Sequence, residues 1–295
     1  MKNKVVLFLL GYKGLKVLKS IIEDNSSAII AEVVIGKDKN ITNDYSKEIS
    51  ALCKASKINY SLEYNTANKV ASYWIAIGWK KILNPTTDLK LLIIHDSLLP
   101  KYRGFAPLVS QLINGEKEVG ASCIIANKNY DEGDILLQES FVVNYPIKIE
   151  AAIESMANIY VKICLNLVQL ILSDQPLKAE PQDDSKATYS LWRDEEDYMI
   201  DWNSDSQKIK RLIDSVGTPY KGARTTLDGQ LIVIHETIEI ADLTIENRTA
   251  GKIIKFQNSC PIVVCGKGLL KISKASYLEN GNSIFPLNKF RSRFS

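Results

Sequence analysis

The stretch IIHDSLLPKYRGFAPL, residues 93–108, joins an apolar run to a turn at one histidine, His95. The run LKLLIIH (89–95) predicts a buried strand, and the Pro and Gly residues behind it predict a turn. His95 therefore stands at the carboxyl end of a predicted strand, the edge where open α/β sheets bind ligands. The alternative is a histidine that only caps the strand and bonds to a backbone carbonyl.

Apolar runs alternate with helical patterns on both sides of this stretch. Such alternation is typical of parallel strands covered by helices, so we expect an α/β domain with a doubly wound, mainly parallel sheet. The predicted strands are 5–10, 28–35, 74–79, 89–95, 120–127 and 135–143, and the predicted helices are 13–23, 45–56 and 149–172.

The sequence changes character after the last of these helices. SDQPLKAEPQDDSKATYS (173–190) is rich in Pro, Asp, Ser and Lys and has no period, which predicts a linker across the surface. A short helix is expected at 205–216, and ARTTL, QLIVIHETIEI, AGKIIKF, PIVVC and LLKISKA predict short strands of an antiparallel barrel or sandwich. We therefore predict a catalytic domain at 1–175, a linker at 176–203 and a smaller, OB-like β domain at 204–295.

Composition indicates an ordinary globular chain, with 45% hydrophobic and 24% charged residues among 295. The apolar run near the N-terminus is short and lacks a small-residue cleavage site, so we interpret it as a buried strand. No uninterrupted apolar stretch approaches the roughly 20 residues of a membrane span. The net charge of +3 is too small to indicate a nucleic-acid partner by itself. Five cysteines without zinc or redox spacing predict reduced, mostly buried thiols, and we expect a cytoplasmic protein.

A second polar cluster, NYDEGDILLQ (129–138), follows another apolar strand and places Asp131 in a tight turn before Gly133. A carboxylate and an imidazole at the ends of separate strands can meet across a cleft. There they supply a general base and an electrophilic group, the pair that acyl transfer requires. The two clusters together therefore point to acyl-transfer chemistry, although neither indicates it alone.

Together the two segments resemble the folate-dependent formyltransferases, which include the enzymes that act on methionyl-tRNA, on glycinamide ribonucleotide and on nucleotide-linked amino sugars. HDSLLPKYRGFAP resembles the family's His-x-Ser-Leu-Leu-Pro segment, and GASCIIANKNYDEGDILLQ resembles the strand and loop that carry its catalytic aspartate. WIAIGWKKIL is similar to the strand and turn that line the folate pocket. IDWNSDSQKIKRLIDSVGTPYKGARTTL is similar to the start of the C-terminal domain in the tRNA and sugar enzymes. The resemblance covers most of the chain.

The resemblance implies that His95 polarises the formyl carbonyl and stabilises the oxyanion. It implies that Asp131 orients a water or accepts a proton from the amine while holding His95 in its useful protonation state. The formyl donor implied is 10-formyltetrahydrofolate, which brings the activated one-carbon unit, and no metal is implied. The residues expected to hold the pterin are Lys81, Ile82, Leu83, Asn127, Asn129, Tyr130 and Asp131.

One position departs from the family pattern. The family has an asparagine two residues before the histidine, and this chain has Ile93. An isoleucine side chain cannot donate a hydrogen bond, and loss of one oxyanion donor costs about 2.7 to 4 kcal/mol. Either a bound water or one of Asn129, Ser97 and Lys80 replaces it, or His95 acts alone, or the protein binds without transferring. An enzyme remains the main interpretation, because the histidine, the aspartate and the pocket segments all match.

The second domain narrows the choice of acceptor amine. Free-standing enzymes that act on glycinamide ribonucleotide lack this domain, which argues against that acceptor. A tRNA enzyme should carry a basic insertion near the site, whereas only scattered lysines lie between Val5 and Asp131. We therefore predict a nucleotide-linked amino sugar as the partner, in lipopolysaccharide or another surface polysaccharide, with methionyl-tRNA as the alternative. The predicted substrate-binding residues are Ser97, Tyr102, Arg103, Tyr189, Trp192 and Arg193.

Structural alternatives accompany several of these aromatic and charged residues. Arg103 could brace its loop against a carboxylate, and Trp202 is expected in the core at the domain junction. His235 lies in the middle of a predicted strand and is expected to be structural. The nucleotide, the sugar and the oligomeric state stay open, with a homodimer as one alternative.

Overall fold

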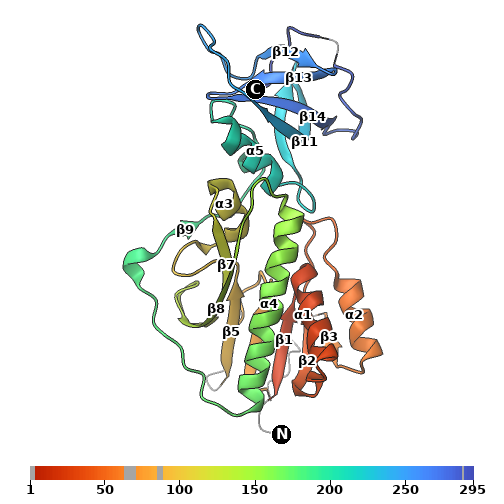
Figure 1. Cartoon of the computed structure of the whole chain (residues 1–295). Coiled ribbons are helices and arrows are strands. Elements are labelled where there is room, and N and C mark those ends of the chain that lie inside the picture. The colour runs from red at the N-terminus through yellow and green to blue at the C-terminus, as the bar shows by residue number, and fades with distance from the viewer. Residues whose placement is uncertain (1–3, 63–70, 85–88, 288) are drawn as a thin grey trace. The chain divides into compact units, whose positions relative to one another are not determined.

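The computed structural model describes residues 4–62, 71–84, 89–287 and 289–295. The chain divides into two compact units (Figure 1). The first is built from the residues up to Leu108, Glu118–Val143 and Ala151–Leu191, and the second from Val109–Lys117, Asn144–Glu150 and Trp192–Ser295.

A seven-stranded sheet forms the first unit, in the order β3-β2-β1-β4-β5-β7-β8. The first five of these strands run parallel, and β7 and β8 complete the sheet as antiparallel strands. The predicted mainly parallel sheet is thus confirmed. The strands are β1 Val5–Leu9, β2 Ile30–Ile35, β3 Tyr60–Ser61, β4 Tyr73–Ile77, β5 Lys90–His95, β7 Glu118–Ile125 and β8 Asp134–Val142.

Helices α1 (Gly11–Glu23) and α4 (Ile149–Leu172) lie on one face of this sheet, and α2 (Ser46–Ala55) packs beside α1 (Figure 1). Helix α4 has 24 residues and is long and apolar enough to cross a membrane by length and composition alone. Half of its most apolar window is nevertheless buried within the protein. The buried residues recur every three or four positions, which is the pattern of a core helix packed on a sheet.

The opposite face of the sheet carries a separate apolar cluster, and the residues that follow β4 and β7 reach it. Ile93 lies at its border. Its buried members are Val6, Phe8, Val34, Ala71, Trp74, Ala76, Leu83, Leu89 and Leu91, and Trp79, Ile93 and Ala126 pack against it partly buried.

Several short elements were not predicted, because segments this small carry no hydrophobic period. They are helix α3 (Pro107–Asn114), strands β6 (Arg103–Gly104) and β9 (Tyr189–Ser190), and the 3₁₀ turns Ser27–Ile29, Asp184–Lys186 and Glu196–Tyr198. Strands β6 and β9 pair in parallel as a separate ribbon.

The second unit contains a five-stranded antiparallel sheet in the order β10-β11-β14-β13-β12, as the sequence predicted. Helix α5 (Ser206–Ser215) begins where the Asp205 carboxylate accepts the backbone N–H of Lys208 at 2.7 Å, a standard N-cap. The strands are β10 Ala223–Leu227, β11 Gln230–Ile240, β12 Ile253–Gln257, β13 Cys260–Val264 and β14 Leu269–Tyr277.

The remaining expectations for side chains in the interior can be checked individually. Trp202 is buried, donates its indole N–H to Thr225 at 2.9 Å and packs against Phe294, so it is a core residue of the second unit. His235 is exposed on β11 and contacts the Ser276 hydroxyl at 2.8 Å. Cys53, Cys123, Cys164 and Cys265 are buried free thiols, and Cys260 is half-buried.

Candidate active site

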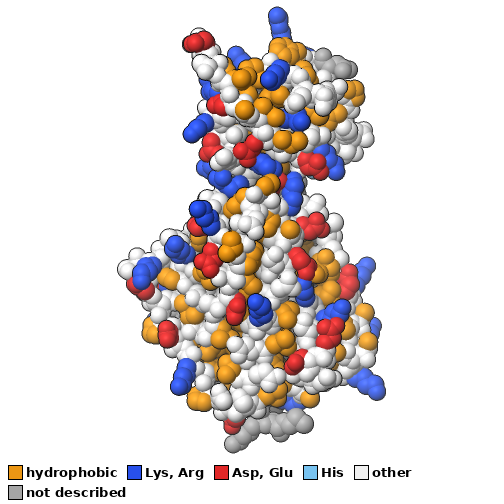
Figure 2. Space-filling view, viewed as in Figure 1, with side chains coloured by type: hydrophobic (Ala, Val, Ile, Leu, Met, Phe, Trp, Pro, Cys, Tyr) orange, Lys and Arg blue, Asp and Glu red, His pale blue; other side chains and the backbone are white. Residues whose placement is uncertain are grey.

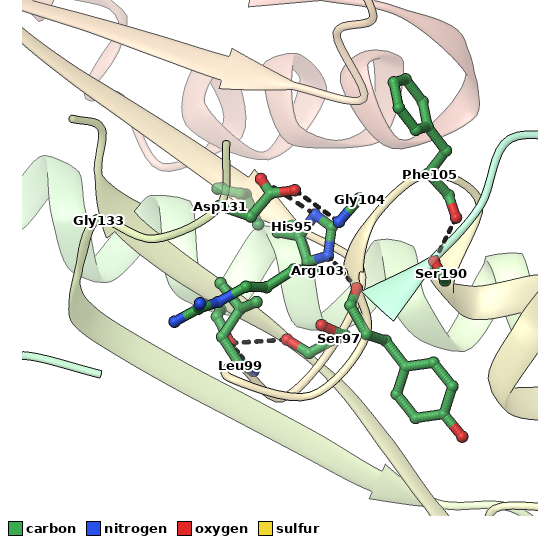
Figure 3. A network of polar contacts seen from close by, with 12 residues as sticks. His95, Ser97, Leu99, Arg103, Gly104, Phe105, Asp131, Gly133 and Ser190 are labelled. Atoms are coloured by element: carbon green, nitrogen blue, oxygen red, sulfur yellow. Dashed lines mark hydrogen bonds and ion pairs between the residues drawn. The ribbon is translucent and has the colours of Figure 1, made fainter. Parts of the chain in front are cut away.

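His95 is the last residue of β5 and is buried, with 8% of its surface exposed. Its ring nitrogen Nε2 lies 2.8 Å from the backbone carbonyl oxygen of Tyr102. Because a carbonyl oxygen only accepts hydrogen bonds, Nε2 must carry the proton in this contact. The other ring nitrogen, Nδ1, faces Asp131 (Figure 3). Nδ1 is therefore the nitrogen available for chemistry.

Asp131 lies on the loop between β7 and β8, in the left-handed region with φ of 57°. Its Oδ1 lies 3.5 Å from His95 Nδ1, too long for a direct hydrogen bond. Its Oδ2 accepts the backbone N–H of Gly104 at 2.8 Å. The loop closes tightly because residue 133 is a glycine: a Cβ there would lie 2.0 Å from the carbonyl oxygen of Ile125. The structure thus brings together the two predicted catalytic residues, His95 and Asp131, here called the dyad.

Arg103 is buried next to the Asp131 loop, with only 2% of its surface exposed. Its guanidinium donates to the Gln182 side chain at 2.9 and 3.1 Å and to Asp184 at 2.6 Å, and it lies 3.6 Å from Glu132. Burial works against its charge, but the hydrogen bonds to Asp184 and Tyr189 outweigh burial and raise the pKa of Arg103. These contacts favour the bracing alternative over a direct contact with substrate phosphate.

Asp96 follows His95 but contacts the helices. Its carboxylate pairs with Lys13 of α1, whose ammonium lies 4.9 Å from the ring centroid of Tyr160 on α4. The Tyr160 hydroxyl donates to the carbonyl of Ile94 at 2.8 Å. Burial is the largest influence on Asp96 and opposes its ionisation, but Lys13 and Tyr160 together outweigh burial and lower the pKa of Asp96.

The residues predicted to hold the pterin come from two segments that both reach the apolar cluster beside Ile93. Leu83, from the segment after β4, is buried in that cluster, and Ala126, from the loop after β7, packs against it. Ile82 and Tyr130 expose 62% and 72% of their surfaces, so each segment presents apolar surface. Lys81 is exposed, and Asn127 shapes the loop by accepting the backbone N–H of Asn129 at 2.9 Å.

Ile93 occupies the position of the family asparagine, two residues before His95 on β5, and so lies on the same face of the sheet. It packs at the border of the apolar cluster. The three side chains considered as substitute donors are engaged elsewhere. The Ser97 hydroxyl donates to the Lys101 carbonyl at 2.6 Å, the Asn129 amide donates to Glu132 at 2.7 Å, and the Lys80 ammonium pairs with Asp38.

The other predicted substrate-binding residues are scattered. Ser97 is fully buried, and Tyr102 contributes its backbone carbonyl to His95. Tyr189 is 67% exposed on strand β9 of the first unit. Trp192, exposed, and Arg193, half-buried, belong to the second unit, and their role stays a prediction.

Sequence reasoning missed two residues that the structure places beside the dyad. Phe105 follows Gly104 and is 60% exposed, and Figure 3 shows its ring projecting from the turn. Gln182 lies in the predicted linker and contacts the Asp131 loop. Phe105 had no usable signal in the sequence, because an aromatic residue after a turn glycine can be either buried or exposed. Gln182 had none, because a glutamine in a Pro- and Asp-rich segment is typical of a solvated linker.

The chain is similar to several known proteins. Methionyl-tRNA formyltransferase from Lactococcus lactis is 27% identical to the chain over 289 residues, covering 92% of this chain and 89% of that enzyme. An N-formyltransferase from Helicobacter canadensis, solved with folinic acid and dTDP-3-aminofucose, has a TM-score of 0.69 at 14% identity, covering 92% of this chain and 98% of its own. A sugar 3N-formyl transferase, solved with dTDP and 5-N-formyl-THF, has a TM-score of 0.67 at 16% identity, covering 98% of this chain and 99% of its own.

Family models cover most of the chain. Residues 13–162 match the formyl transferase domain, which contains both His95 and Asp131, and residues 193–284 match the formyl transferase C-terminal domain. This family uses 10-formyltetrahydrofolate, the formyl donor predicted from the sequence. Both dyad residues therefore lie within the matched formyl transferase domain, and the chain belongs to the formyl transferase family of formyl-transferring enzymes.

Proposed function

We propose that this protein transfers the formyl group of 10-formyltetrahydrofolate to the amine of a nucleotide-linked amino sugar. The transfer forms a bond between the amine nitrogen and the formyl carbon, breaks the bond from that carbon to N10 of the folate, and moves one proton from the amine to N10. The chain must therefore hold the carbonyl oxygen, accept a proton and hold two substrates. The dyad supplies the first two functions, and the segments after β4 and β7 supply apolar surface for the pterin.

His95 would stabilise the oxyanion through Nδ1. In the protonated ring this nitrogen carries N–H, while Nε2–H stays bonded to the Tyr102 carbonyl. Asp131 balances the imidazolium charge through Oδ1 and accepts the amine proton directly or through a water. Because its Oδ2 is fixed by the Gly104 N–H, the carboxylate stays oriented during the transfer.

The observation that best supports a nucleotide-linked sugar as the substrate is two exposed aromatic residues, Phe105 and Tyr189, here called the aromatic pair. Phe105 and Tyr189 expose most of their surfaces. Tyr189 lies on β9, and Phe105 directly follows β6 and donates its backbone N–H to the Ser190 carbonyl at 2.9 Å. The neighbouring Gly104 is bonded to Asp131. An exposed aromatic ring offers a stacking surface to a nucleotide base, which every base can use through its π-face.

The charge distribution also supports a small acceptor over tRNA. The second unit carries basic and acidic residues in nearly equal numbers, and several of its basic side chains are paired within the unit. Lys148 and Lys210 both pair with Asp214, and Arg224 pairs with Glu195. On the face drawn in Figure 2, acidic and basic side chains of the first unit are interspersed. tRNA affinity depends on many phosphate contacts from Lys and Arg, which such a distribution does not favour.

The names of the relatives divide between the two acceptors. The Lactococcus lactis relative is named for methionyl-tRNA, whereas the two solved structures carry sugar-nucleotide names or ligands. Methionyl-tRNA is therefore the second candidate, and one assay separates the two.

The test supplies purified protein with 10-formyltetrahydrofolate and, in parallel, UDP-, dTDP- and GDP-linked amino sugars or charged initiator methionyl-tRNA. Mass spectrometry of the products detects the added formyl group. We expect a formamide on at least one sugar and none on the methionyl-tRNA. Formylation of methionyl-tRNA alone, with steeply salt-dependent tRNA binding, would replace the sugar by tRNA. Folate binding without transfer to any amine would support the binding-only alternative.

A further inference from the structure

Residues 180–190, here called the strap, hold both halves of the active site. At one end, Glu180 and Ile135 exchange two backbone hydrogen bonds of 2.7 and 2.9 Å, so the strap joins β8 just beyond the Asp131 loop. At the other end, the Thr188 hydroxyl and carbonyl accept the backbone N–H groups of Tyr102 and Arg103 at 2.9 and 2.8 Å. The strap therefore fixes the turn after His95 relative to the loop that carries Asp131.

Gln182 makes the direct contact between the strap and that loop. Its side-chain amide Nε2 donates to the backbone carbonyl of Asp131 at 2.7 Å and to that of Gly133 at 2.8 Å. The first of these carbonyls belongs to Asp131, which adopts the left-handed conformation, and the second lies two residues further along the loop. A non-glycine residue in this conformation needs support from its surroundings.

Arg103 sets the orientation of the Gln182 amide. The guanidinium Nε and Nη2 both donate to Gln182 Oε1, at 3.1 and 2.9 Å. Since Arg103 has no acceptor, only the oxygen of the amide can face it, and the NH₂ group must face the loop. The buried arginine thus fixes which atom meets the two carbonyls.

We infer that Gln182 is a positioning residue for formyl transfer: held by Arg103, its amide clamps the Asp131 loop so that the carboxylate stays directed at His95. The inference requires only that the dyad transfers a formyl group, and it holds for either acceptor amine. Gln182 itself lies behind the loop and acts through the backbone of Asp131 and Gly133.

Gln182→Glu is the sharpest test, because it keeps the hydrogen bonds accepted from Arg103 and removes those donated to the loop carbonyls. The carboxylate has the same size and still accepts from Arg103, but an oxygen replaces the donor that faces the two carbonyls. Gln182→Met removes both the acceptor that faces Arg103 and the donor that faces the two carbonyls. Gln175→Met is the matched control, because Gln175 lies in the same surface segment, before the strap, and is exposed.

We expect kcat to fall about 10- to 100-fold in both Gln182 variants, the loss typical of a misplaced catalytic group. KM for the amine should stay within about twofold, because the amine's own contacts are not removed. The thermal midpoint of Gln182→Glu should stay near that of the original protein. Gln175→Met should keep its kcat. The assay uses whichever acceptor is formylated in the experiment above.

A second readout does not depend on activity. The chain has only 2 histidines, so the ¹⁵N resonances of both imidazoles can be resolved by NMR. In Gln182→Glu the His95 ring resonances should shift because the Asp131 carboxylate moves, while those of His235, in the second unit, stay in place. Wild-type kcat in both variants, or unchanged His95 resonances in Gln182→Glu, would overturn the inference. Equal shifts at both histidines would also overturn it, since they would report a general loss of structure.

Discussion

His95 and Asp96 are consecutive residues that end up in opposite kinds of environment. His95, at the end of β5, lies 3.5 Å from Asp131, whose carboxylate accepts the backbone N–H of Gly104. Asp96 is in direct contact with Lys13 and lies beside Tyr160, on the face covered by α1 and α4. In the His95–Asp131 pair, Nδ1 of the histidine and Oδ1 of the aspartate stay available. In the Asp96–Lys13 pair, the two charges neutralise each other.

The difference shows how one strand end can serve stability and chemistry at once. On the helical face, burial would make an unpaired carboxylate costly, so Asp96 is matched by a cation. On the other face, the Gly104 N–H holds the Asp131 carboxylate, and Gln182, oriented by Arg103, holds the Asp131 backbone. We expect changes on the His95 face to alter rate and changes on the Asp96 face to alter stability.

The largest effect should come from removing the dyad itself. His95→Ala and Asp131→Ala should each lower kcat by about 100- to 10,000-fold, since each removes a proton-transfer or oxyanion group. The thermal midpoint should fall only modestly, because each change removes one hydrogen bond, that of His95 to the Tyr102 carbonyl or that of the Gly104 N–H to Asp131. Steady-state kinetics and a melting curve measure both quantities. Retained turnover in both variants would end the catalytic assignment.

Ile93→Asn tests the vacant donor position on the same face. The three named substitutes are engaged elsewhere, so His95 should lack a side-chain co-donor, and a new amide should raise kcat by up to about 100-fold. The same change buries a polar group at the border of the apolar cluster and should cost about 1 to 3 kcal/mol of stability. An unchanged rate in a folded variant would mean that a water already serves as the donor.

Phe105→Ala and Tyr189→Ala should have a smaller effect, confined to acceptor binding. Loss of a stacking ring should raise KM for the nucleotide sugar about tenfold, with kcat nearly unchanged. Leu191→Ala is the matched control, because Leu191 is an equally exposed apolar residue next to the ribbon. If all three variants behave alike, the aromatic pair does not bind a base.

Lys13→Met, on the helical face, should have the smallest effect on rate. It leaves the Asp96 carboxylate without its cation and should cost about 1 to 3 kcal/mol of stability at neutral pH. Because the pKa of Asp96 is lowered in the folded protein, the ion pair stabilises above its unfolded value of about 3.9, and that stabilisation is lost as pH falls through the lower folded pKa.

The stability gap between Lys13→Met and the original protein should therefore narrow below about pH 4. Urea unfolding at neutral and acid pH measures the gap. A drop in kcat as large as that of His95→Ala would instead show that the two faces are coupled.

The sequence by itself predicted the longer strands, the long helices and, through the family resemblance, His95 and Asp131 as the dyad. β11 spans the same residues as the apolar run QLIVIHETIEI, and α4 spans the periodic stretch that ends at Leu172, because hydrophobic period reports which face is buried. His95 and Asp131 were singled out because each follows an apolar strand, and the resemblance of their segments to the formyltransferases then implied their roles. Phe105 remained unassigned although it lies in the stretch that holds His95, since nothing local shows whether an aromatic after a turn is buried or exposed.

Only the tertiary structure decided what surrounds the dyad. Gln182 lies 51 residues from Asp131 in sequence, and Arg103 lies 79 residues from Gln182, so no local pattern links them. Their contacts arise when the strap pairs with β6 and β8, through backbone groups that every residue type carries. Lys13 and Asp96 likewise meet across 83 residues, because α1 lies on the face of the sheet toward which Asp96 is directed. A hydrophobic period is visible in residues that are neighbours in the sequence. Contacts between residues 51 or more positions apart depend instead on how the whole sheet packs.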